Sequence, residues 1–69
     1  MKFNPEKVKI ARELKGWTQQ ELAGKLGGKT TQQIQQLEEG RHAPSMKTLE
    51  ELIAVFDASL GFFFDKEGK

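Results

Sequence analysis

The fold is decided by residues 18–40, TQQELAGKLGGKTTQQIQQLEEG. Two capping boxes open helices within this stretch, Thr18 with Glu21 and Thr30 with Gln33. In each box the threonine hydroxyl accepts from the backbone amide three residues on, and the side chain of that residue accepts from the threonine amide. A short apolar stripe and two helix-ending glycines follow the first box, namely Leu22, Ala23, Leu26, Gly27 and Gly28. The pattern predicts two short helices joined by a glycine-containing turn.

The second of these helices has too few apolar residues to be buried. Ile34 and Leu37 are the only apolar side chains in residues 29–42, and they lie three apart, so one narrow edge faces the core. Three glutamines lie off that edge, at Gln32, Gln35 and Gln36. A mostly exposed second helix after a short first one is the helix-turn-helix layout, in which the second helix enters the major groove of DNA.

Glutamine suits that task because its amide presents a donor and an acceptor together, which matches the N6 donor and N7 acceptor of adenine. A glutamine-rich face is also simply soluble, and composition favours neither interpretation. The position of the glutamines favours base contact, since they cluster at and just after the N-terminus of the helix, the end that reaches base edges.

The flanking sequence predicts further short helices. Asn4 and Pro5 are an N-cap and a first helical residue, and Gly16 ends that helix. Its expected apolar stripe is Val8, Ala11 and Leu14, with Ile10 beside it. Ser45 caps a later helix whose apolar positions recur at helical spacing, at Leu49, Leu52, Ile53 and Phe56. Residues 60–64 add one last short turn. We therefore expect an all-α bundle of about five short helices in a single domain, residues 1–69.

Composition excludes several classes of protein. The 69 residues contain no cysteine, no tyrosine and one histidine, His42, in a predicted surface loop, so we expect no metal site, no cofactor and no enzyme. A phosphate-binding loop is also rejected at residues 27–30, because the preceding strand and first glycine are missing. Neither a signal peptide nor a membrane span is present, which predicts a cytoplasmic protein.

The charge is small but unevenly distributed. The net charge of +1 alone argues weakly against nucleic-acid binding. Residues 1–47 hold nine Lys and Arg against five Asp and Glu, a net +4, and residues 48–69 hold two against five, a net −3. A basic part and an acidic part suit one face meeting phosphate, although ordinary scatter of surface charge gives the same count.

Two sequence blocks carry a resemblance to a known family. They are Gly16-Trp17-Thr18-Gln19-Gln20-Glu21-Leu22-Ala23 and Leu37-Glu38-Glu39-Gly40-Arg41, with Ile34 before the second and Pro44-Ser45 and Leu49 after it. In this order and spacing they resemble the lambda-repressor-like (Xre-type) helix-turn-helix family over residues 5–64. The run from Thr30 to Gln33 is similar to the recognition helices of lambdoid phage repressors.

The resemblance implies roles for individual residues. Base contacts are expected from Thr31, Gln32, Gln35 and Gln36. Phosphate contacts are expected from Gln19, Lys29, Thr30, Arg41, Ser45 and Lys47. An ion pair between Arg12 and Glu38 would hold the recognition helix at its angle, and Trp17 would pack at the corner between the first two helices.

Two features depart from the family pattern. Ala23 to Ile34 spans eleven residues where ten is usual, and the extra residue falls in residues 27–29. This puts the register of residues 29–31 against DNA in doubt, whereas Gln32 and Gln36 are anchored through Ile34. Phe62, Phe63 and Phe64 are adjacent, so they cannot all point into one core, and we expect at least one in an exposed dimer or partner surface.

The leading hypothesis is a transcriptional repressor that binds double-stranded DNA as a homodimer, on a pseudo-palindromic operator. Two alternatives remain open. One is the antitoxin of a toxin–antitoxin pair, which would also bind a protein at its Phe-rich end. The other is a protein-interaction module that has lost DNA binding.

Overall fold

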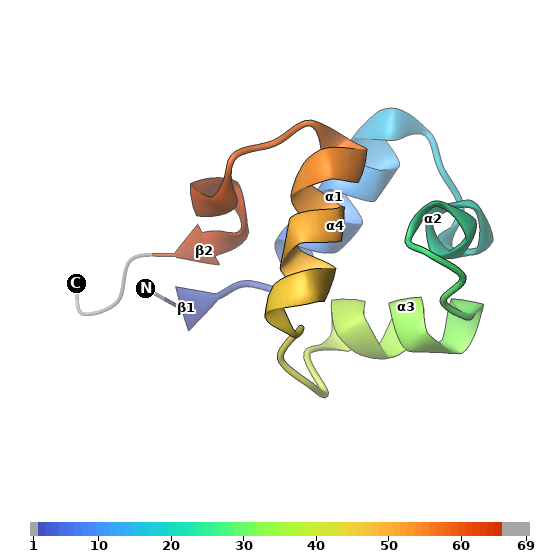
Figure 1. Ribbon diagram of the computed structural model, residues 1–69, viewed down its shortest axis with the longest axis horizontal. Coiled ribbons are helices and arrows are strands. Elements are labelled where there is room, and N and C mark those ends of the chain that lie inside the picture. Colours follow the sequence, from blue (N-terminus) through green and yellow to red (C-terminus); the bar gives the residue numbers. More distant parts are fainter. Residues whose placement is uncertain (1, 66–69) are drawn as a thin grey trace.

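A computed structural model describes residues 2–65 and shows four α-helices with two short strands (Figure 1). The elements in chain order are β1 (Lys2–Phe3), α1 (Glu6–Lys15), α2 (Gln19–Lys25), α3 (Thr31–Glu39), α4 (Met46–Phe56), the 3-10 helix η1 (Leu60–Phe63) and β2 (Phe64–Asp65). The predicted all-α bundle is confirmed. The strand pair was not expected, because two-residue strands leave no alternating pattern in the sequence.

Both capping boxes form as predicted. The Thr18 amide donates to Glu21 Oε1 at 2.8 Å, and the Glu21 amide donates to Thr18 Oγ1 at 3.1 Å. Thr30 and Gln33 form the same pair of bonds at the same distances. Between these helices Gly27 and Gly28 adopt positive φ angles of 70° and 87°. The turn therefore uses two successive left-handed residues, a conformation that glycine adopts without steric cost.

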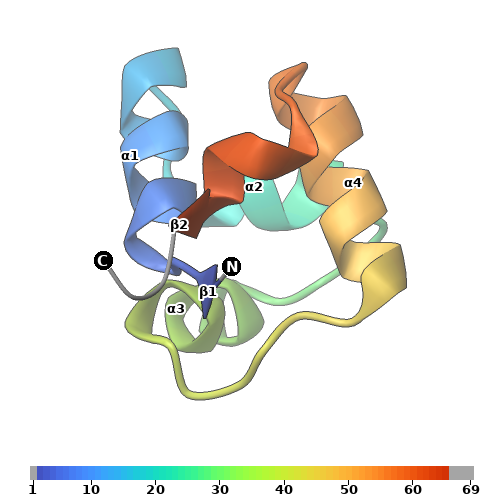
Figure 2. The same ribbon diagram turned by 90° about the vertical axis from the view of Figure 1, so that its left-hand side faces the viewer.

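The core lies between α1, α2, α4 and η1, and α3 closes it from one side (Figure 2). It is built from eleven buried side chains, which are Val8, Ala11, Leu22, Ala23, Leu26, Ile34, Leu37, Leu49, Leu52, Phe56 and Phe63. Trp17 is half-buried at the corner between α1 and α2, where its ring stacks on Phe56 with centroids 5.6 Å apart. This is the packing position expected from the sequence.

The apolar stripe expected on α1 is only partly correct. Val8 and Ala11 are buried, but Leu14 is 79% exposed and Ile10 is 41% exposed. Leu14 lies in the last turn of α1 and lines a hollow between α1, the end of α4 and η1. The helical spacing of an apolar residue shows which face it shares, but not whether a neighbour reaches it.

The three adjacent phenylalanines differ in exposure, and their place in a dimer or partner surface stays a prediction. Phe63 is completely buried and contacts Phe56, with ring centroids 6.1 Å apart. Phe62 and Phe64 are half-buried against the core. The chain passes from η1 into β2 here, and β2 pairs antiparallel with β1. As a result the Phe64 ring packs against the Phe3 ring, with the ring centroids 5.7 Å apart. The change of backbone conformation sends consecutive rings to different neighbours.

We predict that Gly40→Ala destabilises the protein more than Gly16→Ala does. Both glycines end helices at positive φ, 79° and 75°, where alanine costs about 1–2 kcal/mol. A Cβ at Gly40 would lie 3.0 Å from Pro5 Cγ, whereas a Cβ at Gly16 would have no neighbour within 4 Å. Urea unfolding of the two variants measures the difference. Equal losses of unfolding free energy would show that the contact with Pro5 relaxes freely.

Candidate nucleic-acid interface

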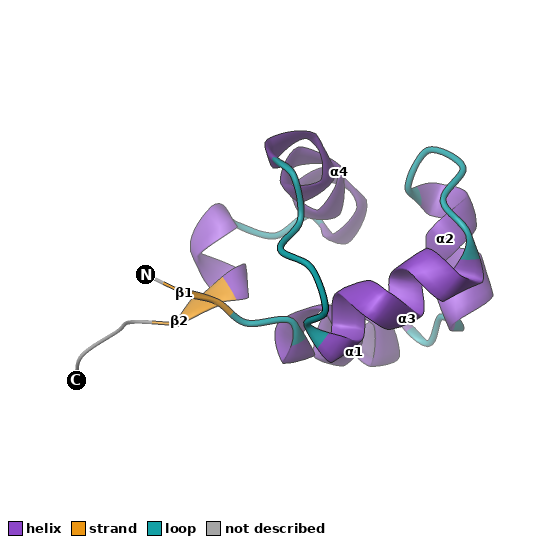
Figure 3. Ribbon diagram, turned by 90° about the horizontal axis from the view of Figure 1, so that it is seen from below, coloured by secondary structure: helices purple, strands orange, loops and turns teal. Residues whose placement is uncertain are grey.

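Helix α3 lies on the outside of the molecule with one edge in the core. Ile34 and Leu37 are buried, and Thr31, Gln32 and Gln35 on other sides of the helix are exposed. Seen from below, α3 lies in front of α1, and no other element passes in front of it (Figure 3). The face opposite the core is therefore open along the whole helix.

A polar network fixes α3 to two other helices. The Arg12 Nε donates to Glu38 Oε2 at 2.7 Å, and Arg12 Nη2 lies 3.3 Å from Glu38 Oε1. The structure thus contains the ion pair that the resemblance implied, with only 11% and 4% of the two side chains exposed. Arg12 Nη1 also donates to the Trp17 carbonyl oxygen at 2.8 Å. One guanidinium therefore joins α1, the α1–α2 corner and the end of α3.

Gln19 belongs to the same network, which the sequence interpretation did not foresee. Its Nε2 donates to Glu38 Oε1 at 3.0 Å, so the side chain is half-buried and tied to α3. Gln19 is also the first residue of α2, where backbone amides lack partners within the helix. Its contact with phosphate stays a prediction, and the second amide hydrogen of the side chain and these backbone amides are the donors that could make it.

The Glu38 carboxylate favours the charged form of Arg12. Hydrogen bonding to Glu38 raises the pKa of Arg12 above its ordinary value, against the opposing effect of partial burial. Because an arginine side chain is not deprotonated in proteins, Arg12 carries the positive charge that the ion pair needs.

The outward face of α3 carries a polar hollow of about 170 Å³. Its lining brings four of the predicted contact residues together with one that was not predicted, and consists of Gln32, Gln35, Gln36, Glu39 and Arg41. Glu39 accepts from Arg41 Nε at 2.8 Å and from Gln35 Nε2 at 3.2 Å. The hydrogen bond from Arg41, followed by that from Gln35, lowers the pKa of Glu39. Helical spacing from Gln35 and Gln36 could have placed Glu39 on this face.

A second hollow of about 210 Å³ lies between α3 and the start of α4. Lys29, Ser45 and His42 line it together with Gln36, which thus borders both hollows. The longer turn therefore places Lys29 beside the N-terminus of α4, where unpaired backbone amides favour an anion. The Ser45 hydroxyl accepts from the Thr48 amide at 3.1 Å, so Ser45 caps this helix as predicted.

The remaining predicted residues lie at the edges of this surface or away from it. Thr30 and Thr31 are exposed at the N-terminus of α3, and Lys47 is exposed in the first turn of α4 without lining either hollow. Residues 62–64 lie in η1 and β2, on another part of the molecule (Figure 1).

The sequence of this chain matches the family HTH_3, described as helix-turn-helix, over residues 8–63. The match covers most of the chain and includes all four α-helices except the first two residues of α1. The chain belongs to the lambda-repressor-like, Xre-type helix-turn-helix family. It is therefore a member of a family of DNA-binding transcription regulators.

No curated protein matches the chain. In the described part of this helix-turn-helix protein no helix is long and apolar enough to cross a membrane. Among the same residues, no three His, Cys, Asp or Glu side chains are grouped so that they could hold a metal ion.

We predict that Glu38→Gln destabilises this helix-turn-helix domain by about 3 kcal/mol, because it leaves the enclosed Arg12 charge without its partner. The matched variant Glu39→Gln breaks an exposed ion pair with Arg41 and should change the unfolding free energy little. Chemical denaturation followed by circular dichroism measures both. Similar stabilities for the two variants would contradict the structural role of the Arg12–Glu38 pair.

Proposed function

We propose that this protein is a cytoplasmic transcriptional repressor that binds a pseudo-palindromic operator as a homodimer, with α3 in the major groove. The observation that carries the proposal is the exposed glutamine face of α3, held by the Arg12–Glu38–Gln19 network. In a dimer of this kind the half-sites lie one helical turn, or roughly 34 Å, apart.

Base readout falls to the residues on the outward face of α3. Gln32 and Gln36 lie one helical turn apart and share a hollow, so both amides can address neighbouring base pairs. Gln35 already donates to Glu39 and has its amide oxygen left as an acceptor. Thr31, exposed at the start of the helix, is the fourth expected base contact.

Phosphate contacts surround this face. Lys29 and Ser45 line the hollow beside α4, Lys47 is exposed in the first turn of α4, and Gln19 and Thr30 stand at helix N-termini. The Thr30 hydroxyl accepts a bond within its capping box, but its own hydrogen remains available for a phosphate oxygen. These positive and donor groups supply affinity that does not depend on sequence.

Dimerisation needs apolar residues that the core leaves exposed. Phe63 is enclosed in the core, so it cannot contact a second copy. Leu60, 47% exposed in η1, offers an apolar contact in its place.

The experiment that tests DNA readout is selection of a binding site from random duplexes, followed by titration of wild type, Gln32→Ala and Gln20→Ala. Gln20 is an exposed glutamine on α2 with no predicted DNA contact. We expect Gln32→Ala to lose roughly 1–3 kcal/mol of discrimination at one base pair with an unchanged salt dependence. Gln20→Ala should bind as wild type does.

The same selection decides between hypotheses. A two-fold-symmetric site supports the dimer, and an asymmetric or single half-site argues against it. If no sequence is enriched and binding stays weak at low salt, the DNA-binding proposal fails, and the protein-interaction module becomes the better hypothesis.

We predict that Glu39→Gln binds operator DNA more tightly than wild type. The substitution removes a negative charge from the face that meets phosphate and releases Arg41, whose Nε is bound to Glu39 in the free protein. The slope of log affinity against log salt should steepen by about one, since one more cation reaches the backbone. Fluorescence anisotropy at several salt concentrations measures both quantities. The double variant with Arg41→Ala is the control, because it should lose the steepening.

A further inference from the structure

An apolar groove lies on the side of the molecule away from α3. It has a volume of about 180 Å³ and is formed by α1, the end of α4 and η1. Its lining residues are Ala11, Leu14, Lys15, Phe56, Ala58 and Phe62. The C-terminal ends of α1 and α4 stand at the top of Figure 1, with α3 at the bottom, so the groove does not share a face with the recognition helix.

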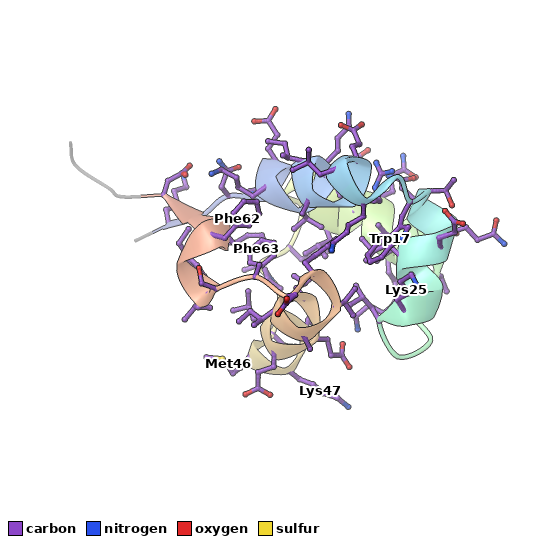
Figure 4. All side chains as sticks on the ribbon, turned by 90° about the horizontal axis from the view of Figure 1, so that it is seen from above. Trp17, Lys25, Met46, Lys47, Phe62 and Phe63 are labelled. Carbon is purple, nitrogen blue, oxygen red and sulfur yellow. The ribbon has the colours of Figure 1, made fainter. Side chains whose placement is uncertain are left out.

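Leu14, which lines the groove, and Ile10, which precedes it by one turn outside the lining, are apolar side chains that the fold does not bury. Leu14 is 79% exposed, and Ile10, one turn earlier on α1, is 41% exposed. The Phe62 side chain, on η1, is half-buried on the side toward α1 (Figure 4). Leaving a leucine in water forgoes roughly 1.5–3 kcal/mol of burial, and apolar side chains grouped at a hollow mark a binding surface more often than isolated ones do.

The charges beside the groove are positive. Lys15 lines it, and the Lys7 Nζ lies 5.2 Å from the centre of the Phe62 ring. Both lysines share the face of α1 that carries Ala11, since Lys7, Ala11 and Lys15 follow one another at intervals of four residues. Among the described residues no carboxylate lines the groove; Glu13 and Asp57, each next to a lining residue in sequence, are exposed outside it.

We propose that this groove binds a segment of another protein in which one large apolar side chain is flanked by aspartate or glutamate. The volume is close to that of a 150 Å³ cavity that holds a benzene ring, so it accepts a single side chain of leucine or phenylalanine size. The flanking carboxylates then meet Lys7 and Lys15. A second copy of this chain is disfavoured, because two such faces would bring the lysines of both copies together. The proposal does not rest on DNA binding, and a partner here leaves α3 free.

The experiment is selection of short random peptides displayed on phage, with the intact chain immobilised. The enriched peptides are then synthesised and titrated against wild type, Leu14→Asp and Met46→Asp. Both substitutions place aspartate at an exposed apolar position, but Met46 does not line the groove, so it controls for the added charge. A second pair, Lys15→Glu and Lys9→Glu, compares a lining lysine with an exposed lysine on α1 that is not in the lining.

We expect the selected peptides to share one large apolar residue next to acidic residues. Leu14→Asp and Lys15→Glu should each weaken binding about tenfold or more, while Met46→Asp and Lys9→Glu bind as wild type does. Amide chemical shifts of labelled protein should move at the groove and not along α3. Peptides that lack acidic residues, or that bind Leu14→Asp equally well, would overturn the proposal. So would a dimer in sedimentation that Leu14→Asp converts to a monomer, because a second copy would then cover the groove.

Discussion

The contact between Arg12 and Glu38 is the interaction on which the arrangement of α3 depends. Helix α3 buries only Ile34 and Leu37, each worth about 1.5–3 kcal/mol, and a nine-residue helix is too short to be stable alone. The bidentate contact from Arg12, with the bond from Gln19, fixes the last turn of α3 to α1 and α2. The capping box at Thr30 fixes the first turn. Polar contacts at both ends therefore replace the apolar burial that this helix lacks.

In that arrangement the side chains on the outward face of α3 do not hold the helix in place. Gln32 makes no side-chain hydrogen bond among those found in the described residues, and Gln36 borders two hollows without closing either. In the free protein, water forms the hydrogen bonds of such side-chain amides. Specificity arises when a matching base edge takes the place of that water. Glu39 is the exception, because its charge opposes phosphate and is balanced by Arg41 in the free protein. Affinity for DNA then depends on whether Arg41 leaves Glu39 to contact a DNA phosphate, because the Glu39 charge is then no longer balanced.

The sequence predicted the features that follow from local chemistry. Both capping boxes, the glycine turn and the cap at Ser45 need only residues a few positions apart. The partner of Arg12 came from the family resemblance, since 26 residues separate it from Glu38 and no local pattern joins them. The bond of Gln19 to Glu38, the exposure of Leu14 and the burial of Phe63 were missed, because each is decided by how elements distant in sequence pack. The pairing of the two-residue strands β1 and β2 likewise depends on how segments distant in sequence come together, and periodicity does not predict it.

The pairing of β1 with β2 also positions η1, which forms one wall of the groove on the far side of the molecule. The Asn4 amide donates to the Phe63 carbonyl oxygen at 2.8 Å, and the Asn4 side chain bonds both Asp65 and the Glu6 amide. Asn4 thus joins the start of α1 to the C-terminal segment and holds η1 against that helix, which places Phe62 beside Lys7. Helix α1 therefore serves two surfaces with different residues: Arg12 reaches α3, and Ala11, Leu14 and Lys15 form the wall of the groove. Because the two sets point to different sides of one helix, a change at the groove need not disturb the contact that orients α3.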